Sequence, residues 1–475
     1  MIASIIGKTF LKAYNSKYSK DYSAKEFFEK EYFQLFFNHP KYMQWVINSP
    51  FVQMKSEQKP HLLKSEDRLK KLENLHSKID SGEIDASIAI GYPASEVKKF
   101  ATTSGLVTDI GSKHTPEEVY FSWIGGGLGI GISGGYSILF DNEDILLTLY
   151  EGWKQYRSLL NDEGLSGMRG NKINTWNGQW LNFRLGRAYS NDFDYTTLER
   201  EGVLSISTNN IEVNTISWSS LFFNVSSLLN GQTIPGYVYS LEKTNKTLGF
   251  CPFQFSSART IRKFYSQLFG ENAALEDSKD YERLYGIDIK RAFEMGAIGM
   301  QALEPDGLRK YYGDSSNIRL SKPNIKPKKD EGEEDFEVRK RTAYEKDRNN
   351  IINYRTYKTW LLAMITKNKE ENLNYSREVA KALHEYRARG SKTDRVNLIQ
   401  SSLLGAKSKK AFIDALVKVV EDTTTDIVKD KCGEESLEVY KELRDRVHMM
   451  NSEDFGYFVV LLKFDYAYAE RELNK

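Results

Sequence analysis

Apolar residues recur at helical spacing through the first eighty residues of the chain. The run SAKEFFEKEYFQLFF begins with Ser23 and Glu26, a Ser-x-x-Glu capping box, and its apolar positions then lie three and four apart. A second amphipathic run, SEDRLKKLENLHSKID, begins at Ser65, which we expect to cap it. The pattern predicts helices up to about Gly82.

Between about Ala86 and Phe255 the pattern changes to short runs rich in β-branched and aromatic residues, separated by Asn-Gly and Gly-Gly pairs. The predicted strands are EVYFSWI, YSILFD, VLSIST, IEVNTISW and GYVYSLE. The last run is followed by KTNK and TLGFCPF, which together predict a β-hairpin with a basic, polar tip.

Helices return after this region, beginning with ARTIRKFYSQLFG. The segment from Ser321 to Arg341 carries prolines and many charges with almost no apolar residue, which is typical of a linker or an exposed loop. Amphipathic helices joined by short glycine-bearing connections follow, one of them capped by Ser408, and they predict an antiparallel bundle.

We therefore expect an α+β protein whose N-terminal domain has a mixed or antiparallel β core with flanking helices, followed by a C-terminal all-α helical bundle. The expected boundaries are 1–320 for the α+β domain, 321–345 for the charged linker and 346–475 for the bundle.

Composition narrows the classes of function. Two cysteines far apart, six scattered histidines and no HExxH motif give little basis for a zinc site, a disulfide framework or a histidine triad, so we expect no metal or other cofactor and no catalysis. No apolar run is long enough for a signal peptide or a membrane span, and we expect a cytoplasmic protein. The formal charge of +2 means that a nucleic-acid footprint has to be local.

The glycine-rich run IGGGLGIGISGGYSILF contains GIGISG, Gly129 to Gly134, which fits the G-x-G-x-x-G pattern of dinucleotide-binding folds. That fingerprint needs a helix opening on its last glycine, whereas YSILFD is strand-like. The pattern favours a glycine-rich hairpin that another backbone approaches closely, as a tight packing seam or as a backbone presented to a duplex.

The stretch GNKINTWNGQWLNFRLGR, Gly170 to Arg187, is the most unusual polar run. Asn and Gln side chains offer a donor and an acceptor together, as adenine readers do, and nearby cations suit phosphates. The alternative is a tight Asn-Gly turn whose tryptophans fill the core. The candidate DNA-binding residues of this stretch are Lys172, Asn174, Trp176, Asn177, Gln179, Trp180, Arg184 and Arg187. The hairpin tip adds Lys243, Asn245 and Lys246.

Two further basic groups are candidates for contacts to a nucleic-acid backbone. Arg259, Arg262 and Lys263 lie in the first two turns of a helix, where cations oppose the helix dipole and an external phosphate would satisfy them. A ridge at the interhelix turns of the bundle suits a single-stranded backbone. Its members are Arg387, Arg389, Lys392, Arg395, Lys407, Lys409 and Lys410. Both groups are equally compatible with ordinary solvated faces.

The run FSWIGGGLGIGISGGYSILFDNEDILLTLYEGWKQYRSLLN, then NTWNGQW, then GYVYSLEKTNKTLGF with CPFQF, resembles the large subunit of type I-B CRISPR Cascade complexes, over roughly Glu118 to Phe255. Members of that family often carry a cysteine-rich, zinc-like segment. This chain lacks one, which indicates a divergent member without that metal site.

The resemblance implies a non-catalytic subunit of antiviral defence that lies near the crRNA 5′ handle, recognises the protospacer-adjacent motif and helps to open target double-stranded DNA. It implies R-loop formation in which the subunit holds the displaced single strand, and partners that include Cascade backbone subunits and a recruited helicase-nuclease, while guide pairing reads the sequence. It also implies that the bundle matches the small subunit, sometimes made from an internal start, and Met364 is placed at the expected beginning of the bundle.

Two other functions remain open from the sequence. One is a nucleotide-binding or metal-dependent nuclease subunit that uses the glycine-rich run or the acids Asp141, Glu143 and Asp144, although these acids suit a helix N-terminus equally well. The other is a structural scaffold whose basic clusters make no direct contact with nucleic acid.

Overall fold

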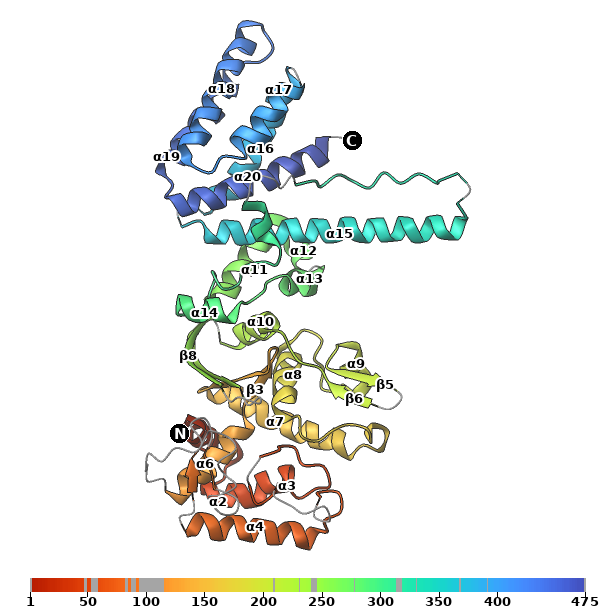
Figure 1. Cartoon of the computed structure of the whole chain (residues 1–475), viewed down its shortest axis with the longest axis vertical. Coiled ribbons are helices and arrows are strands. Elements are labelled where there is room, and N and C mark those ends of the chain that lie inside the picture. The colour runs from red at the N-terminus through yellow and green to blue at the C-terminus, as the bar shows by residue number, and fades with distance from the viewer. Residues whose placement is uncertain are drawn as a thin grey trace. The chain divides into compact units, whose positions relative to one another are not determined.

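A computed structural model describes residues 2–46, 49–52, 59–81, 84–86, 91–93, 115–207, 210–229, 231–240, 246–276, 278–312, 318–329, 331–366, 369–390 and 392–473. The chain forms two compact units (Figure 1). Unit 1 contains Met1–Ser256 and Ile289–Gly299, and unit 2 contains Ser257–Asp288 and Met300–Lys475. The α+β class with a helical C-terminal region is confirmed. The compact units differ from the expected boundaries, since unit 2 includes residues well before 346.

Unit 1 is a small antiparallel sheet surrounded by helices. Its helices are α1 (Ile2–Tyr18), α2 (Ala24–Phe27), the π-helical turn Phe28–Tyr32, α3 (Phe33–Phe36), α4 (Ser65–Asp80), α6 (Pro116–Gly127), α7 (Glu143–Asn161), the 3₁₀ turn Glu163–Leu165, α8 (Ile173–Leu185), α9 (Tyr195–Arg200), α10 (Trp218–Leu228) and α14 (Ile289–Met295). Its strands are β1 (Ile84–Ala86), β2 (Gly91–Pro93), β3 (Ile130–Ile132), β4 (Tyr136–Phe140), β5 (Leu204–Ser207), β6 (Asn210–Val213), β7 (Thr233–Ser240) and β8 (Lys246–Gln254).

The central sheet has the strand order β3-β4-β7-β8, and every neighbouring pair is antiparallel. The β7–β8 hairpin confirms the sequence prediction, whereas residues 241–245 of its tip lie outside the described residues. Strands β1 with β2 and β5 with β6 form separate two-stranded sheets. The aromatic residues mostly fill the core, where Trp123, Trp153, Trp176 and Trp180 are almost completely buried.

Local capping signals decided several helix starts. The Ser23–Glu26 capping box forms as predicted, and Ser408 caps its helix through the Ala411 amide. The cap of α4 is Lys64 rather than Ser65, and the Lys64 amide donates to Asp67 Oδ2 at 3.3 Å. EVYFSWI is not a strand. It lies in α6, because Thr115 and Glu118 form a capping box with Pro116 in the first turn, and these start signals outweigh the β propensity of the run.

The glycine-rich run is a packing seam, as one of the two sequence interpretations held. Its first part ends α6, where a Cβ on Gly125 would lie 1.9 Å from the Ala3 carbonyl oxygen of α1. Its second part forms the β3–β4 hairpin, with Gly134 at a φ of +88°. Helix α8 presses on β3, since a Cβ on Gly178 would lie 2.2 Å from the Gly131 carbonyl oxygen. Because a strand follows GIGISG where a dinucleotide fold needs a helix, the fingerprint interpretation is excluded.

Unit 2 is helical, and its longest helix is α15 (Figure 1). Its elements are α11 (Ser256–Phe269), α12 (Glu271–Glu276), α13 (Ser278–Arg283), the 3₁₀ turn Leu308–Tyr312, α15 (Glu333–Met364), α16 (Asn372–Ala388), α17 (Lys392–Asn397), the π-helical turn Leu398–Leu403, α18 (Lys409–Val428), α19 (Glu435–Met449) and α20 (Ser452–Leu473). The second half of α15 is buried and packs on α20.

Helix α15 corrects two sequence interpretations. The segment predicted as a linker is extended only to Lys329, and from Glu333 it is helical, because three acids in the first turn favour the helix N-terminus. Met364 does not open the bundle. It is the last residue of α15, and the helix before it supplies Lys358, whose ammonium lies 2.7 Å from both Asp465 carboxylate oxygens in the interior.

Candidate nucleic-acid interface

The stretch from Gly170 to Arg187 is neither an exposed loop nor an Asn-Gly turn, since Ile173–Leu185 form helix α8. Trp176 and Trp180 are buried, and their indole N–H groups donate to the carbonyls of Gly152 and Thr148 at 2.7 and 2.8 Å. The structural alternative for these two tryptophans, filling the core, is therefore correct, and the DNA contacts predicted for them have no exposed surface to use.

The two amides predicted to read bases are also inside the protein. Asn177 is fully buried, and its amide nitrogen donates to the carbonyls of Gly127 at 2.8 Å and Gly129 at 2.9 Å. Gln179 is 6% exposed. The Asn177 amide bridges the end of α6 and the start of β3 by donating to one carbonyl of each. Its role in this fold is to hold the glycine seam rather than to meet a base.

Four residues of the stretch remain nearer the surface. Lys172 and Arg187 are exposed, while Arg184 lies over the Tyr189 ring at 4.3 Å. Asn174 is half-buried and donates to Ser137 Oγ at 3.2 Å. It lines a cavity of about 310 Å³ beside the β3–β4 turn. Lys243 and Asn245 lie outside the described residues, and so does the side chain of Lys246.

The cations at the start of α11 are not equivalent. Arg262 pairs with Glu282 at 3.1 Å and Lys263 with Glu370 at 2.7 Å, so internal carboxylates already balance both charges. Arg259 is exposed. Of the three residues, Arg259 alone remains a candidate for contact with a nucleic-acid backbone, as the sequence predicted.

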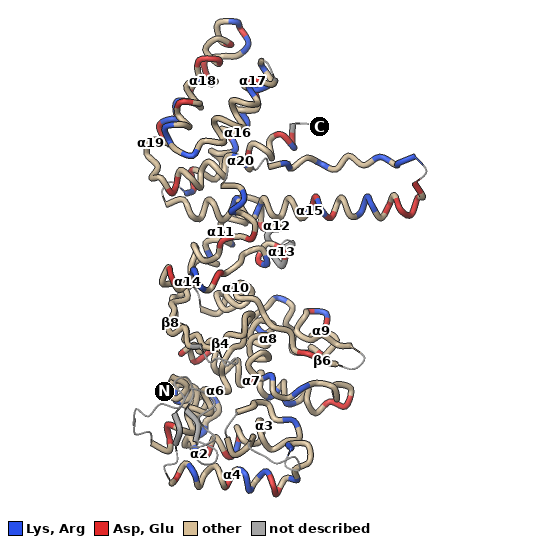
Figure 2. Tube along the Cα trace, in the orientation of Figure 1, with Lys and Arg blue, Asp and Glu red and all other residues tan. Residues whose placement is uncertain are grey.

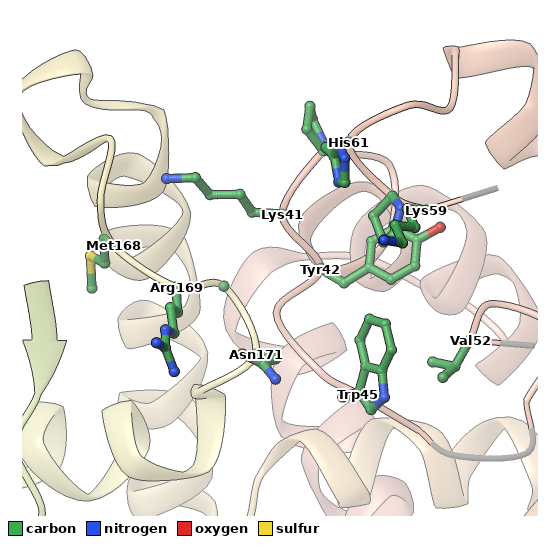
Figure 3. Close-up of a pocket in the computed structure, with 12 residues that line it drawn as sticks. Lys41, Tyr42, Trp45, Val52, Lys59, His61, Met168, Arg169 and Asn171 are labelled. Atoms are coloured by element: carbon green, nitrogen blue, oxygen red, sulfur yellow. The ribbon is translucent and has the colours of Figure 1, made fainter. Parts of the chain in front are cut away.

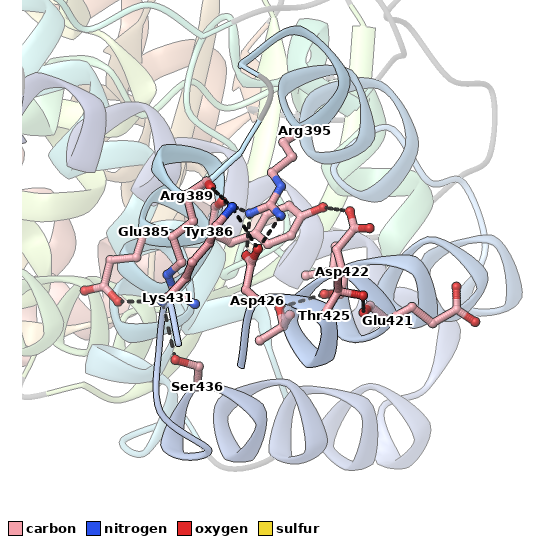
Figure 4. A network of polar contacts seen from close by, with 12 residues as sticks. Glu385, Tyr386, Arg389, Arg395, Glu421, Asp422, Thr425, Asp426, Lys431 and Ser436 are labelled. Carbon is pink, nitrogen blue, oxygen red and sulfur yellow. Dashed lines mark hydrogen bonds and ion pairs between the residues drawn. The ribbon is translucent and has the colours of Figure 1, made fainter. Parts of the chain in front are cut away.

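The basic ridge of the bundle is largely a set of internal ion pairs (Figure 4). Arg395 binds Asp426 through both guanidinium nitrogens, at 2.8 and 3.1 Å, and Arg389 lies 3.5 Å from Glu385. Arg387 pairs with Glu470. Lys409 caps the end of α19 by donating to the carbonyls of His448 and Met450. Lys407 and Lys410 are exposed, and the side chain of Lys392 is outside the described residues. Most of the ridge therefore holds helices together.

A different basic surface was not predicted from the sequence. Residues 318–329, which we call the basic segment, run extended alongside the first half of α15 and carry a row of positive charges (Figures 1 and 2). Five cations and no carboxylate occur in it, and all five are exposed. They are Arg319, Lys322, Lys326, Lys328 and Lys329. None of the ion pairs formed among the described residues involves any of them.

Two arginines fasten the basic segment. Arg471 of α20 donates to the Leu320 carbonyl at 2.8 Å and forms a bidentate pair with Asp347 at 2.6 and 2.7 Å. Arg339 of α15 donates to the Lys326 carbonyl at 3.0 Å and binds both Glu331 oxygens at 2.6 Å. The Arg339 hydrogen bonds and the Lys328 amide lower the pKa of Glu331 to about 2. These two clasps, the contacts made by Arg471 and by Arg339, involve backbone carbonyls and acidic side chains. They therefore leave the lysine side chains of the basic segment exposed.

The inner end of the basic segment meets a polar cavity of about 280 Å³ within unit 2. Arg319, Arg387 and Lys463 contribute cations to its lining, and Glu470 contributes the one carboxylate. The row of exposed cations therefore continues into a hollow of the same sign, which is the arrangement expected of a track for a phosphate backbone.

The described residues contain no group of three or more His, Cys, Asp or Glu side chains arranged to hold a metal ion. Among the described helices, none combines the length and the apolar character needed to cross a membrane. Comparison with known proteins gave no match to any protein-family profile, any curated protein or any solved structure.

Proposed function

We propose that this chain is a non-catalytic subunit that binds nucleic acid and recognises target DNA within an RNA-guided complex. The observation that carries the proposal is the basic segment, where five exposed cations follow an extended backbone and none forms an ion pair among the described residues. The resemblance of residues Glu118 to Phe255 to the large subunit of type I-B Cascade supplies the RNA-guided setting.

In this proposal the protein handles shape and charge, while base pairing with the guide reads the target. The basic segment holds a phosphate backbone, most simply that of the displaced single strand, with little sequence preference. The partners are crRNA, the target duplex, Cascade backbone subunits and a recruited helicase-nuclease that cleaves. Reading of the adjacent motif falls to surfaces other than the buried amides of α8, and the complex acts in the cytoplasm.

The test replaces Lys322, Lys326, Lys328 and Lys329 together with Gln in the full chain. Because all four are exposed, folding should be unchanged. We expect weaker binding to a single strand and a shallower dependence of the binding constant on salt. The slope of log K against log salt should fall by roughly 0.7 for each single-strand phosphate that the variant no longer neutralises. Filter binding or fluorescence anisotropy at several salt concentrations measures both quantities.

A matched control replaces four other exposed lysines of unit 2, Lys381, Lys418, Lys429 and Lys441, with Gln. The control changes the net charge equally, so it should leave the salt slope close to that of the unaltered chain. Equal slopes for both quadruple variants would remove the basic segment from the interface. Absence of any salt-sensitive binding by the unaltered protein would favour the structural scaffold instead.

A further inference from the structure

A cavity of about 530 Å³ opens in unit 1, and two segments far apart in the sequence form its walls (Figure 3). One wall comes from residues within 40–45, from Val52 and from residues 59–61, and the other comes from the loop Met168–Asn171. The volume lies within the range of small-molecule sites in proteins. No pattern along the chain indicated this cavity, because its two walls lie more than a hundred residues apart in the sequence.

An exposed tryptophan marks the cavity. Trp45 is 46% exposed and lines the cavity below the Tyr42 ring (Figure 3). The other tryptophans of unit 1 are each at most 7% exposed, so this indole alone is withheld from the core. An accessible indole face is a platform on which any nucleobase can stack.

Positive charge surrounds the same cavity. Lys41, Lys59 and Arg169 line it. Two buried arginines lie behind its wall, since Arg157 donates to the Lys41 carbonyl at 3.2 Å and Arg68 to the Pro60 carbonyl at 3.3 Å. None of the ion pairs found among the described residues includes any of these five cations. A group of cations that forms no ion pair with the described carboxylates attracts an anion from outside.

Three buried polar groups, one on a lining residue and two behind the wall, have no hydrogen-bond partner within the described structure. The Tyr42 hydroxyl belongs to a residue that is 3% exposed, and neither it nor Arg157 Nη1 nor Arg68 Nε makes a hydrogen bond there. Burial lowers the pKa of Arg157 to about 10 and raises the pKa of Tyr42 to about 12. Buried donors of this kind are normally satisfied, and of the three groups the Tyr42 hydroxyl belongs to a residue that lines the cavity.

The two walls are fixed against each other. Lys41 Nζ donates to the Ser166 carbonyl at 2.8 Å, and the Tyr156 hydroxyl donates to the Arg169 carbonyl at 2.6 Å. A Cβ on Gly170 would lie 2.4 Å from the Tyr42 carbonyl oxygen, so the loop passes too close for a side chain there. The cavity is therefore preformed rather than a chance gap between loose segments.

We propose that this cavity binds one unpaired nucleotide, with its base stacked on Trp45 and its phosphate held by Arg169. The nucleotide belongs either to an unpaired stretch of nucleic acid or to a free nucleotide, and both share this chemistry. The inference deepens the proposed function and rests on it only for the source of the nucleotide.

The experiment uses the full chain and three probes, which are inorganic phosphate, dAMP and a five-nucleotide oligo(dA), with calorimetry as the readout. We expect dAMP to bind at least tenfold more tightly than phosphate, because the base adds the stacking contact. Trp45→Ala should weaken dAMP binding by roughly fivefold to a hundredfold and leave phosphate binding unchanged. Arg169→Gln should weaken both. Tyr195→Ala and Arg200→Gln, at an exposed aromatic and an exposed cation elsewhere in unit 1, are the matched controls.

Two results would overturn the proposal. One is equal affinity of the unaltered protein for phosphate and dAMP, and the other is unchanged dAMP binding by a Trp45→Ala variant with an unaltered melting temperature. Oligo(dA) binding that is tighter than dAMP binding and is weakened by Trp45→Ala, with both measured in the quadruple lysine variant so that the basic segment does not contribute, identifies a strand as the source. Equal binding of the two probes identifies a free nucleotide, and either result supports the pocket.

The pocket and the proposed function fail separately. If the quadruple lysine variant keeps the salt dependence of strand binding while Trp45→Ala loses dAMP, the DNA-recognition role fails and the nucleotide pocket stands. If the quadruple variant loses strand binding while Trp45→Ala binds dAMP normally, the pocket fails and the function stands.

Discussion

The two units treat buried positive charge in opposite ways. In unit 2, Lys358 meets Asp465 and Arg395 meets Asp426, each within hydrogen-bonding distance of a carboxylate. In unit 1, the buried arginines Arg157 and Arg68 reach only backbone carbonyls within the described structure, beside a cavity that three further cations line.

This difference separates cations that build the fold from cations available to a ligand. A buried cation with its own carboxylate is electrically complete, and removing either partner leaves an uncompensated charge inside the protein. A buried cation without a carboxylate has already lost its hydration during folding. An incoming anion can therefore neutralise its charge without a further desolvation cost for the cation. Counting basic residues along the sequence cannot make this distinction, because Arg395 and Arg157 look alike until their surroundings are known.

The largest effect is expected from breaking the pair in the interior of unit 2. Lys358→Met should lower the free energy of unfolding of that unit by about 3–5 kcal/mol, because it leaves the Asp465 carboxylate buried without a counter-charge. Chemical denaturation followed by circular dichroism measures the loss. The double variant Lys358→Met with Asp465→Leu, which removes both charges, should recover much of it. A double variant no more stable than the single one would contradict the explanation by charge.

The same pair predicts the behaviour of a fragment beginning at Met364. This fragment lacks Lys358. It also lacks Tyr354, whose hydroxyl donates to Asp465 Oδ1 at 2.7 Å. We therefore expect little cooperative unfolding from this fragment, in contrast to the independent bundle that the sequence indicated. A sharp thermal transition for the isolated fragment would show that α20 finds other partners.

An intermediate effect is expected at Arg395. Arg395→Gln should lower the free energy of unfolding by about 2–3 kcal/mol, since the nearly buried Asp426 is left without its bidentate guanidinium partner. Binding to a single strand at a temperature where the variant is folded should be unchanged. A variant of normal stability with weakened strand binding would return the bundle ridge to the interface and remove the distinction between the units.

A smaller effect is expected from the corresponding change in unit 1. Arg157→Met should lower the free energy of unfolding by only about 1–2 kcal/mol, because removal of an uncompensated charge offsets the absence of the hydrogen bonds to Leu35 and Lys41. Denaturation of the full chain under the conditions used for Lys358→Met compares the two directly. A cost as large as that of Lys358→Met would mean that Arg157 has an anionic partner.

The smallest effect concerns the pH dependence of His39. Burial, followed by the nearby charge of Arg157, lowers its pKa from 6.5 to about 4. The unfolded chain therefore binds this proton more readily, and stability should fall as the pH drops from about 6.5 to 4. With solvent screening of this half-exposed ring, the loss should be about 1 kcal/mol. His39→Asn should remove it, and a measured ring pKa near 6.5 would contradict the prediction.

Local signals in the sequence predicted much of the fold. The caps at Ser23 and Ser408 and the β7–β8 hairpin follow from interactions within a few residues. The failures arose where tertiary packing outweighed propensity. Asn177 and Gly178 form a turn signal in isolation, yet here the glycine lets α8 approach β3 and the amide bridges two carbonyls about fifty residues away.

The candidate sites were harder to predict than the fold. The basic segment has the composition of a linker, and only the clasps from Arg471 and Arg339 show that it is held against a helix. The proposed nucleotide pocket joins Trp45 to Arg169, more than a hundred residues later, and no pattern along the chain links the two. Most of the polar residues concentrated in the stretch from Gly170 to Arg187 are buried or bonded within the fold, whereas the accessible aromatic and cationic groups come from separate stretches.

The clasped arrangement of the basic segment has a consequence for the entropy of association. Ordering a backbone costs about 1–2 kcal/mol per residue, and a flexible lysine-rich tail meets that cost when its ligand arrives. Here helix α15, which is 32 residues and about 48 Å long, supports the basic segment along its length. The backbone of the basic segment is therefore ordered during folding. The spacing of the lysines is therefore fixed before the ligand binds. A polyanion whose charges repeat at the same spacing should bind more tightly than one of equal charge with a different spacing.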